Sequence, residues 1–301
     1  MFYLEKIAYN SITTFFKLIG RIPRQGAIRL SNVLGRILFV ADKKHRMIAI
    51  DNLTRAFGRE KNQAEITIIA RSVFNNLARV LFEIGWSLNL DRKDFHKHFI
   101  IEGLSNYKKS YEKNKGVLGL TAHMGNWELL PIIEAMIGYP LNIIYRPLDL
   151  SFLDRFFIML RSRFGAKTTP KTNSMFKIFK SLKQGEIIAV LMDQNVAWYE
   201  GVFVDFFGHR ACTNKGMALL ALKTKAPVVP IFLVREGKGF KAEFGPEVPL
   251  IKTGDMTKDI EANTRQYNKI IEEFIQRYPD QWFWVHQRWK TKPFSRWPRT
   301  Y

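Results

Sequence analysis

The sequence contains a single cysteine, Cys212, in 301 residues, so no disulfide can form within the chain. A fold without disulfides is typical of a reducing compartment. Apart from His209 no activating partner is evident near Cys212, and we expect the thiol to be a packed small residue. The chain is 47% hydrophobic and 14% aromatic, which excludes an intrinsically disordered protein.

Sequence motifs for nucleotide and cofactor chemistry are also missing. There is no G-x-x-x-x-G-K-[ST] loop, no G-x-G-x-x-G fingerprint and no G-x-S-x-G elbow. No cluster of cysteine and histidine has the spacing of a zinc site. We therefore expect no metal and no resident cofactor, and any group that is transferred should arrive already activated.

Acidic residues are few. The chain has 27 Asp and Glu against 47 Lys and Arg, which gives a formal net charge of +20. This excess indicates an anionic partner, and charge alone leaves nucleic acid, an anionic membrane and a phosphorylated or acidic substrate open.

No apolar run is long enough to span a membrane, because the uncharged stretch from Ile7 to Phe16 ends at Lys17. No small-residue cleavage site follows it, so we expect no cleavable signal peptide. Residues 1–40 nevertheless mix apolar and aromatic side chains with lysine and arginine, as interfacial amphipathic helices do. We predict that residues 1–40 are membrane-associating helices and that residues 41–301 form the main domain. Ordinary surface helices packed on the body are the alternative.

Strand and helix patterns alternate after a long helical pattern at 64–88. Strands are expected at 116–122, 141–146, 186–192, 227–234 and 240–244, and helices at 127–137, 151–164, 173–183, 214–224 and 256–277. This alternation predicts an α/β fold with a largely parallel central sheet flanked by helices. Ligand sites in such sheets lie at the carboxyl ends of the strands. His123, Arg146 and Asp193 each follow a predicted strand, so we expect them at one edge.

The most informative stretch is His123-Met-Gly-Asn-Trp-Glu128, at the junction of a predicted strand and helix. On one unbroken helix, residues five apart point about 140° away from each other, so these side chains meet only if the backbone turns. Gly125 supplies a flexible point, and Asn126 is a suitable N-cap for a helix that begins at Trp127. In that geometry Glu128 reaches one imidazole nitrogen and leaves the other free to accept a proton. A structural ion pair is the alternative.

Four further polar residues are ambiguous from the sequence alone. Arg146 would bind an anionic substrate group or pair with Asp149. Arg161 and Arg163 end an apolar helix, where cations are favourable without any function. Asp193 follows an apolar strand, and a carboxylate buried there needs a partner, which we expect to be an arginine.

Two aromatic stretches also have two interpretations each. Residues 202–208 would be core packing or a wall for an acyl chain. Residues 281–290, with three tryptophans beside Arg288 and Lys290, would suit a membrane interface or stacking on single-stranded nucleic acid.

In this order, the segments resemble the bacterial lipid A late acyltransferases, the lauroyl/myristoyl acyltransferase family, over most of the chain. Thr121–Glu128 is similar to the family's H-x4-D/E signature. Related glycerolipid acyltransferases share that signature, so the ordered set of segments is the specific feature. Family members typically have a hydrophobic N-terminal membrane helix, which charges interrupt here. The other matching segments are 46–57, 145–147, 161–163, 192–194, 203–208 and 285–290.

The resemblance implies an O-acyltransferase that moves a fatty acyl chain from acyl carrier protein or acyl-CoA to a hydroxyl of a lipid A precursor. It implies His123 as general base, Glu128 as its orienting partner, and Arg161 and Asp193 as site residues. We expect Arg146 and Arg163 to line the same cleft. The implied partners are acyl carrier protein, an anionic glycolipid and the membrane surface. The implied location is the cytoplasmic face of the bacterial inner membrane, in a monotopic or peripheral mode.

The residues fit this chemistry. A thioester is already activated, and a neutral histidine suits proton removal from a hydroxyl near pH 7. The resulting oxyanion needs donors, for which the backbone at Gly125 and Asn126, or a nearby arginine, are candidates. Transfer to another glycolipid or to a lysophospholipid is the alternative within the class. A basic nucleic-acid-binding protein and a catalytically silent membrane scaffold are the rivals outside it. We expect no nucleic acid, because that reading leaves the polar groups at the strand ends unexplained.

Overall fold

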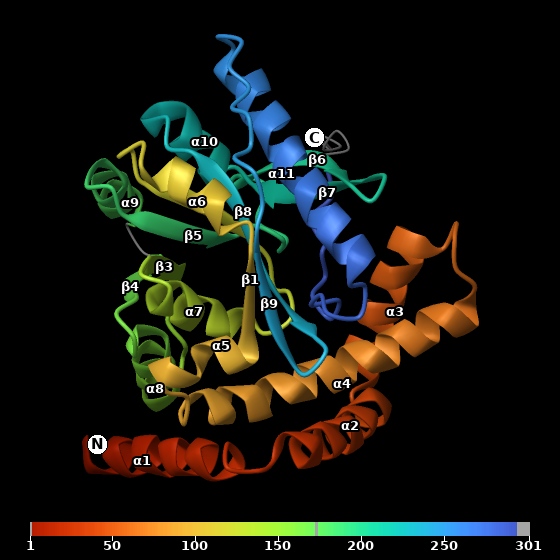
Figure 1. The fold of residues 1–301 in the computed structure, drawn as a ribbon. Coiled ribbons are helices and arrows are strands. Elements are labelled where there is room, and N and C mark those ends of the chain that lie inside the picture. The colour runs from red at the N-terminus through yellow and green to blue at the C-terminus, as the bar shows by residue number, and fades with distance from the viewer. Residues whose placement is uncertain (1, 172–173, 294–301) are drawn as a thin grey trace.

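The computed structural model describes residues 2–171 and 174–293, and its centre is a seven-stranded sheet with helices on both faces (Figure 1). The strand order is β1-β9-β8-β2-β5-β3-β4. A separate antiparallel hairpin is formed by β6 (Gly201–Phe206) and β7 (His209–Asn214). The strands of the main sheet are β1 (Phe99–Glu102), β2 (Val117–Thr121), β3 (Leu141–Tyr145), β4 (Lys167–Pro170), β5 (Ile187–Leu191), β8 (Val228–Glu236) and β9 (Gly239–Phe244).

Within the main sheet, every neighbouring pair is parallel except β8 and β9, which are antiparallel. The predicted α/β fold with a largely parallel sheet is therefore confirmed. The five predicted strands correspond to β2, β3, β5, β8 and β9. The short strands β1 and β4, of four residues each, were not predicted, and neither was the hairpin.

The helices predicted within residues 1–40 and at 64–88, 151–164, 173–183, 214–224 and 256–277 are present, whereas α3, α5 and α6 were not predicted. At the start of α4 the Asn62 side chain and Glu65 form a capping box, and Asp255 caps α11. The helix expected at 127–137 is divided into a 3₁₀ turn, η2 (Trp127–Leu129), and α7, whose first turn contains Pro131. The α-helices are α1 (Phe2–Ile19), α2 (Arg24–Ala41), α3 (Lys43–Phe57), α4 (Gln63–Ser87), α5 (Phe95–His98), α6 (Leu104–Tyr111), α7 (Leu130–Met136), α8 (Ser151–Ser162), α9 (Ser174–Lys183), α10 (Gly216–Thr224) and α11 (Met256–Arg277), and a 3₁₀ turn, η1 (Arg92–Asp94), precedes α5.

Alternate residues of the central strands point to opposite faces of the sheet and join two separate apolar clusters. On β2, Leu118 and Leu120 join the cluster that also contains residues of α10 and α11, whereas Val117 joins the cluster with α7 and α8. This is the two-residue period of a strand buried on both faces. Cys212 of β7 is buried, as expected of a packed thiol.

The N-terminal helices α1 and α2 lie along α4, and α1 also contacts α8 (Figure 1). The α1–α4 crossing is very close. A Cβ atom built on Gly85 of α4 would lie 2.5 Å from the Phe16 carbonyl oxygen, and one on Gly20 would lie 2.0 Å from the Gly85 carbonyl oxygen. Glycine at these positions therefore lets two backbones meet. Among the described residues, no helix has the length and apolar character needed to cross a membrane.

We predict that Gly85→Ala lowers the stability of the protein. Alanine favours a helix over glycine by about 1 kcal/mol, so the change would be stabilising if space were available. The added methyl group meets the α1 backbone instead, and overpacking costs typically about 1–3 kcal/mol. The matched control is Gly26→Ala on α2, where the nearest atom is the flexible Ile22 side chain at 3.2 Å. Thermal unfolding of both variants checks this, and an unchanged or higher melting temperature for Gly85→Ala would contradict it.

Candidate active site

The candidate active site lies at the carboxyl ends of β2 and β5, which are adjacent and parallel. Thr121 at the end of β2 is in register with Leu191 at the end of β5. Two residues beyond these positions, the chain presents His123 after β2 and Asp193 after β5. The strand register thus brings together two polar residues that are 70 positions apart.

His123 and Asp193 form the central pair of the site. The ring Nδ1 of His123 lies 2.8 Å from Asp193 Oδ1, and the His123 backbone N–H donates to Oδ2 at 3.0 Å. The indole N–H of Trp282 donates to the same Oδ2 at 2.7 Å. The carboxylate is 1% exposed and the imidazole 15% exposed. Because Nδ1 faces the carboxylate, the ring turns its Nε2 toward the cleft.

The electrostatics of the pair follow from this geometry. Burial of the imidazole opposes its protonation, but the charge of Asp193 and its hydrogen bond outweigh burial and raise the pKa of His123. Burial works against the charged form of Asp193 too, yet the contacts with His123 and the Trp282 N–H hold the pKa of this carboxyl below its usual value. Asp193 is therefore a carboxylate that orients the ring and favours its protonated form.

The partner predicted for His123 was Glu128, and this pairing is wrong. Glu128 instead accepts two hydrogen bonds from Arg161, from Nε to Oε2 and from a terminal nitrogen to Oε1, both at 2.8 Å. The arginine expected for Asp193 is likewise replaced by His123. The reason is local: η2 turns Glu128 toward α8, whose last turn contains Arg161. Glu128 stays close enough for its charge to contribute to the raised pKa of His123.

Two of the predicted cleft arginines have different environments. Arg146 lines the cleft with an 84% exposed side chain, and its guanidinium is 4.0 Å from the Asp149 carboxylate. Arg163 points away, because its guanidinium donates to the backbone carbonyl oxygens of Ser87 and Leu90. The expectation that Arg163 lines the cleft is wrong: it attaches the end of α8 to the chain after α4.

Of the predicted oxyanion donors, the backbone N–H of Gly125 is occupied, whereas the role of the Asn126 backbone N–H stays a prediction. The Gly125 N–H donates to the Gln281 carbonyl oxygen at 2.9 Å, and the Asn126 side-chain amide donates to Glu83 at 3.0 Å. Asn126 occupies the N-cap position of η2, as predicted, but its side chain makes no cap hydrogen bond. Glycine is required at 125 because φ is +55° and a Cβ atom would lie 2.3 Å from the Leu233 carbonyl oxygen.

His123 opens onto a cleft of about 1140 Å³ that is lined by both polar and apolar residues. Sequence reasoning missed three contacts of the ring: Gln194, whose Nε2 is 3.4 Å from His123 Nε2, and Trp127 and Phe283, whose ring centroids are 5.1 and 5.8 Å away. Each lies beside a residue that was singled out, which is the only signal the sequence offers. The apolar lining residues include Pro131, Ile143, Ile144, Ile178, Val190, Met192, Val196, Met217, Leu219 and Leu220.

Neither aromatic stretch forms a wall of the cleft for an acyl chain. Within the described part of the chain, the cleft lining includes none of residues 202–207 or 282–289. Phe206, Trp282 and Trp284 are buried in the apolar core instead. The guanidinium of Arg288 is also fully buried, 4.7 Å from the Phe206 ring, and donates to Cys212 and Thr213.

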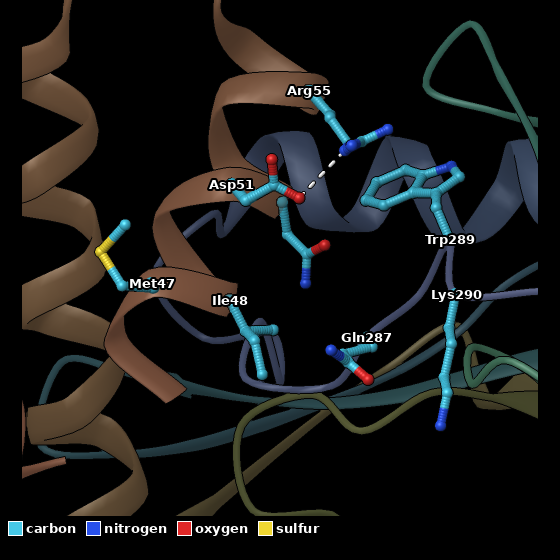
Figure 2. Close-up of a pocket in the computed structure, with 8 residues that line it drawn as sticks. Met47, Ile48, Asp51, Arg55, Gln287, Trp289 and Lys290 are labelled. Atoms are coloured by element: carbon cyan, nitrogen blue, oxygen red, sulfur yellow. Dashed lines mark hydrogen bonds and ion pairs between the residues drawn. The ribbon is translucent and has the colours of Figure 1, made fainter. Parts of the chain in front are cut away.

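A second, smaller pocket of about 330 Å³ lies between α3 and the segment around Gln287 (Figure 2). Arg55 and Asp51 of α3 form an exposed ion pair at its edge, and Trp289 and Lys290 lie across from them. None of the residues predicted for catalysis or substrate binding lines this pocket. Over residues 2–171 and 174–293, no three His, Cys, Asp or Glu side chains are grouped so as to hold a metal ion.

Comparison with known proteins identifies the class. The sequence profile described as "Bacterial lipid A biosynthesis acyltransferase" matches residues 5–291. A "Lipid A biosynthesis acyltransferase" of Haemophilus influenzae is 27% identical over 279 residues, which cover 92% of this chain and 86% of that protein. A "Lipid A biosynthesis palmitoleoyltransferase" of Escherichia coli is 28% identical over 255 residues, with 83% and 80% covered. A "Phosphatidylinositol mannoside acyltransferase" of Mycolicibacterium smegmatis is 23% identical over 242 residues, with 79% and 77% covered.

The chain is therefore an O-acyltransferase. It belongs to the bacterial lipid A biosynthesis acyltransferase family, because the profile spans nearly all of it.

We predict that Asp193 governs the titration of His123. In Asp193→Asn the ring loses a full negative charge at hydrogen-bond distance, so the pKa of His123 should fall below that of the wild type. Glu128→Gln is the matched control, since Glu128 acts on the ring only through space and is paired with Arg161. We expect a smaller decrease there. Histidine NMR titration checks both, and an equal or larger effect of Glu128→Gln would contradict the assigned pairing.

Proposed function

We propose that this chain transfers a fatty acyl chain from an acyl carrier protein or acyl-CoA thioester to a hydroxyl of a lipid A precursor. Family membership supports a glycolipid acceptor of the lipid A type. The observation that carries the proposal is the buried Asp193–His123 pair, whose imidazole lines a large cleft together with many apolar residues. A base beside an acyl-binding surface is what transfer to a hydroxyl requires.

In this proposal His123 Nε2 removes the proton from the attacking hydroxyl, and Asp193 orients the ring and stabilises the imidazolium that forms. Asp193 therefore takes the orienting role that the sequence led us to expect of Glu128. Glu128 instead fixes the guanidinium of Arg161 at the cleft wall through two parallel hydrogen bonds. Arg161 and Arg146 then offer positive charge to an anionic acceptor.

The apolar lining of the cleft suits the acyl chain. Its residues come from β3, β5 and the segment after it, α7, α9 and α10. Burial contributes about 0.8 kcal/mol per methylene, so a chain of ten or more carbons gains substantially from such a surface. The excess of lysine and arginine favours an acidic carrier protein as the donor.

A second acceptor class has one specific observation in its favour. The relative from Mycolicibacterium smegmatis is named for a phosphatidylinositol mannoside, which is a different glycolipid. Transfer to another glycolipid or to a lysophospholipid is therefore the alternative to be tested beside lipid A.

The experiment offers purified protein acyl carrier protein thioesters of graded chain length, or acyl-CoA, with a lipid A precursor or a lysophospholipid. We expect transfer to the lipid A precursor. His123→Ala should lower turnover by about 10²–10⁴-fold, the usual contribution of general base catalysis. His96→Ala, an exposed histidine of α5, is the matched control and should keep wild-type turnover.

Three outcomes would overturn parts of the proposal. Near-normal turnover in folded His123→Ala removes the base. Acylation of the lysophospholipid alone moves the chain to the glycerolipid acyltransferases. Failure of every transfer, together with tight and salt-sensitive RNA binding, favours the nucleic-acid reading.

We further propose that residues 1–40 attach the protein to the cytoplasmic face of the inner membrane without crossing it. Large apolar side chains are exposed along α1 and α2, beside exposed cations such as Lys17, Arg29 and Arg36. This combination is typical of helices that lie in an anionic membrane interface. The exposed apolar side chains are Tyr3, Leu4, Ile7, Phe15, Leu18, Leu30, Val33, Ile37, Leu38 and Val40.

Membrane attachment has a clear signature in fractionation. High salt screens the charge attraction but not apolar insertion, so we expect partial release in high salt and full release only in detergent. Val33→Asn combined with Ile37→Asn should increase the soluble fraction, because both side chains are exposed on α2. Met256→Asn, also exposed but at the start of α11, is the control. Quantitative recovery of the wild type in the soluble fraction at low salt would refute the attachment.

A further inference from the structure

The proposed acyl transfer leaves one chemical requirement without a residue. When the hydroxyl attacks the thioester, the carbonyl oxygen becomes an oxyanion, and enzymes stabilise it with pre-oriented hydrogen-bond donors. Of the backbone donors expected from the sequence, the Gly125 N–H is engaged with the Gln281 carbonyl oxygen. The guanidinium of Arg161 is paired with Glu128. A side-chain donor close to His123 Nε2 would meet the requirement.

We propose that the side-chain amide of Gln194 donates a hydrogen bond to this oxyanion. Gln194 lines the cleft, and its Nε2 is 3.4 Å from His123 Nε2, the atom that would take the proton from the attacking hydroxyl. A hydroxyl oxygen bonded to Nε2 is one covalent bond from the reacting carbon and two from the oxyanion. A donor this close to the base therefore reaches the oxyanion while the base holds the proton.

The backbone on both sides of Gln194 is fixed, which supplies the pre-orientation. Asp193 before it is held by three donors. Asn195 after it donates its backbone N–H to His286 Nε2 at 2.8 Å. Burial lowers the pKa of His286 to about 4, so this ring is neutral near pH 7 and its Nε2 remains an acceptor.

The side chain of Asn195 adds two contacts with Thr291. Its amide donates to the Thr291 hydroxyl at 2.9 Å, and its carbonyl oxygen accepts from the Thr291 backbone N–H at 3.1 Å. Gln194 thus lies between two anchored residues, and its own side chain lines the cleft with its Nε2 3.4 Å from His123 Nε2. A donor on such a rigid segment needs little reorganisation when charge develops.

The reaction needs no co-reactant besides the thioester. The hydroxyl oxygen forms a bond to the carbonyl carbon, its proton moves to His123 Nε2, and the π electron pair moves to the carbonyl oxygen beside Gln194. Collapse of this intermediate re-forms the C=O bond and breaks the C–S bond. The departing thiolate takes the proton back from His123, which leaves an ester and a thiol.

Gln194→Met tests the inference, because methionine has a similar length and no N–H donor. We expect kcat to fall by about 10²–10³-fold with KM nearly unchanged, as when one oxyanion donor is lost. The same substitution at Gln184, an exposed residue that follows α9, is the control and should leave both constants unchanged. The NMR titration of His123 in Gln194→Met should stay close to that of the wild type, which separates oxyanion stabilisation from a role in holding the ring.

The role of Gln194 rests on the proposed acyl transfer, and different experimental results would refute each of them. A Gln194→Met enzyme with wild-type kcat, or with its whole defect in KM, overturns the role of Gln194 and leaves the acyl transfer standing. A defect in kcat that comes with a large change in the His123 titration also overturns it, in favour of a positioning role. A wild-type protein that transfers no acyl group refutes the function, and this inference with it.

Discussion

The site depends on one buried negative charge, the carboxylate of Asp193. An ionised carboxylate that is buried without partners costs several kcal/mol, and this one is 1% exposed. Three N–H groups offset the cost: the ring and backbone of His123 and the indole of Trp282. These donors come from two distant parts of the chain, and Asp193 comes from a third. The charge can therefore be buried only when β2, β5 and the segment around Trp282 have assembled.

The segment around Trp282 holds the loop after β2 in the same way as a neighbouring strand would. Met124 and Trp282 form an antiparallel bridge, the Gly125 N–H donates to Gln281, and the Phe283 N–H donates to His123. The Gln281 side chain in turn exchanges hydrogen bonds with the backbone of Arg235 at the end of β8. His123 thus sits on a short ladder of backbone hydrogen bonds that holds the loop in place, although the loop belongs to no strand of the main sheet.

The sheet was predictable because its central strands are buried on both faces and read as continuous apolar runs between helical patterns. The position of the site followed from the same runs, since His123 and Asp193 directly succeed β2 and β5. The pairing was not predictable. It depends on β2 and β5 being neighbours in register, and a spacing argument over His123–Glu128 considers only local geometry. Trp282 donates to Asp193 from 89 positions further along the chain. In an aromatic-rich stretch, the sequence does not distinguish an indole that donates to a carboxylate from one that only packs in the core.

The separate pairing of the two carboxylates also sets the chemistry of the base. A general base must be neutral before it accepts a proton, and both Asp193 and Glu128 favour the charged imidazole. If both faced the ring without other partners, the pKa of His123 would be raised further, and less of the ring would be in the neutral form that acts as the base. The guanidinium of Arg161 engages both oxygens of Glu128 and offsets its charge at close range. Arg161 therefore limits the effect of Glu128 on the ring, and Asp193 remains the carboxylate that orients it.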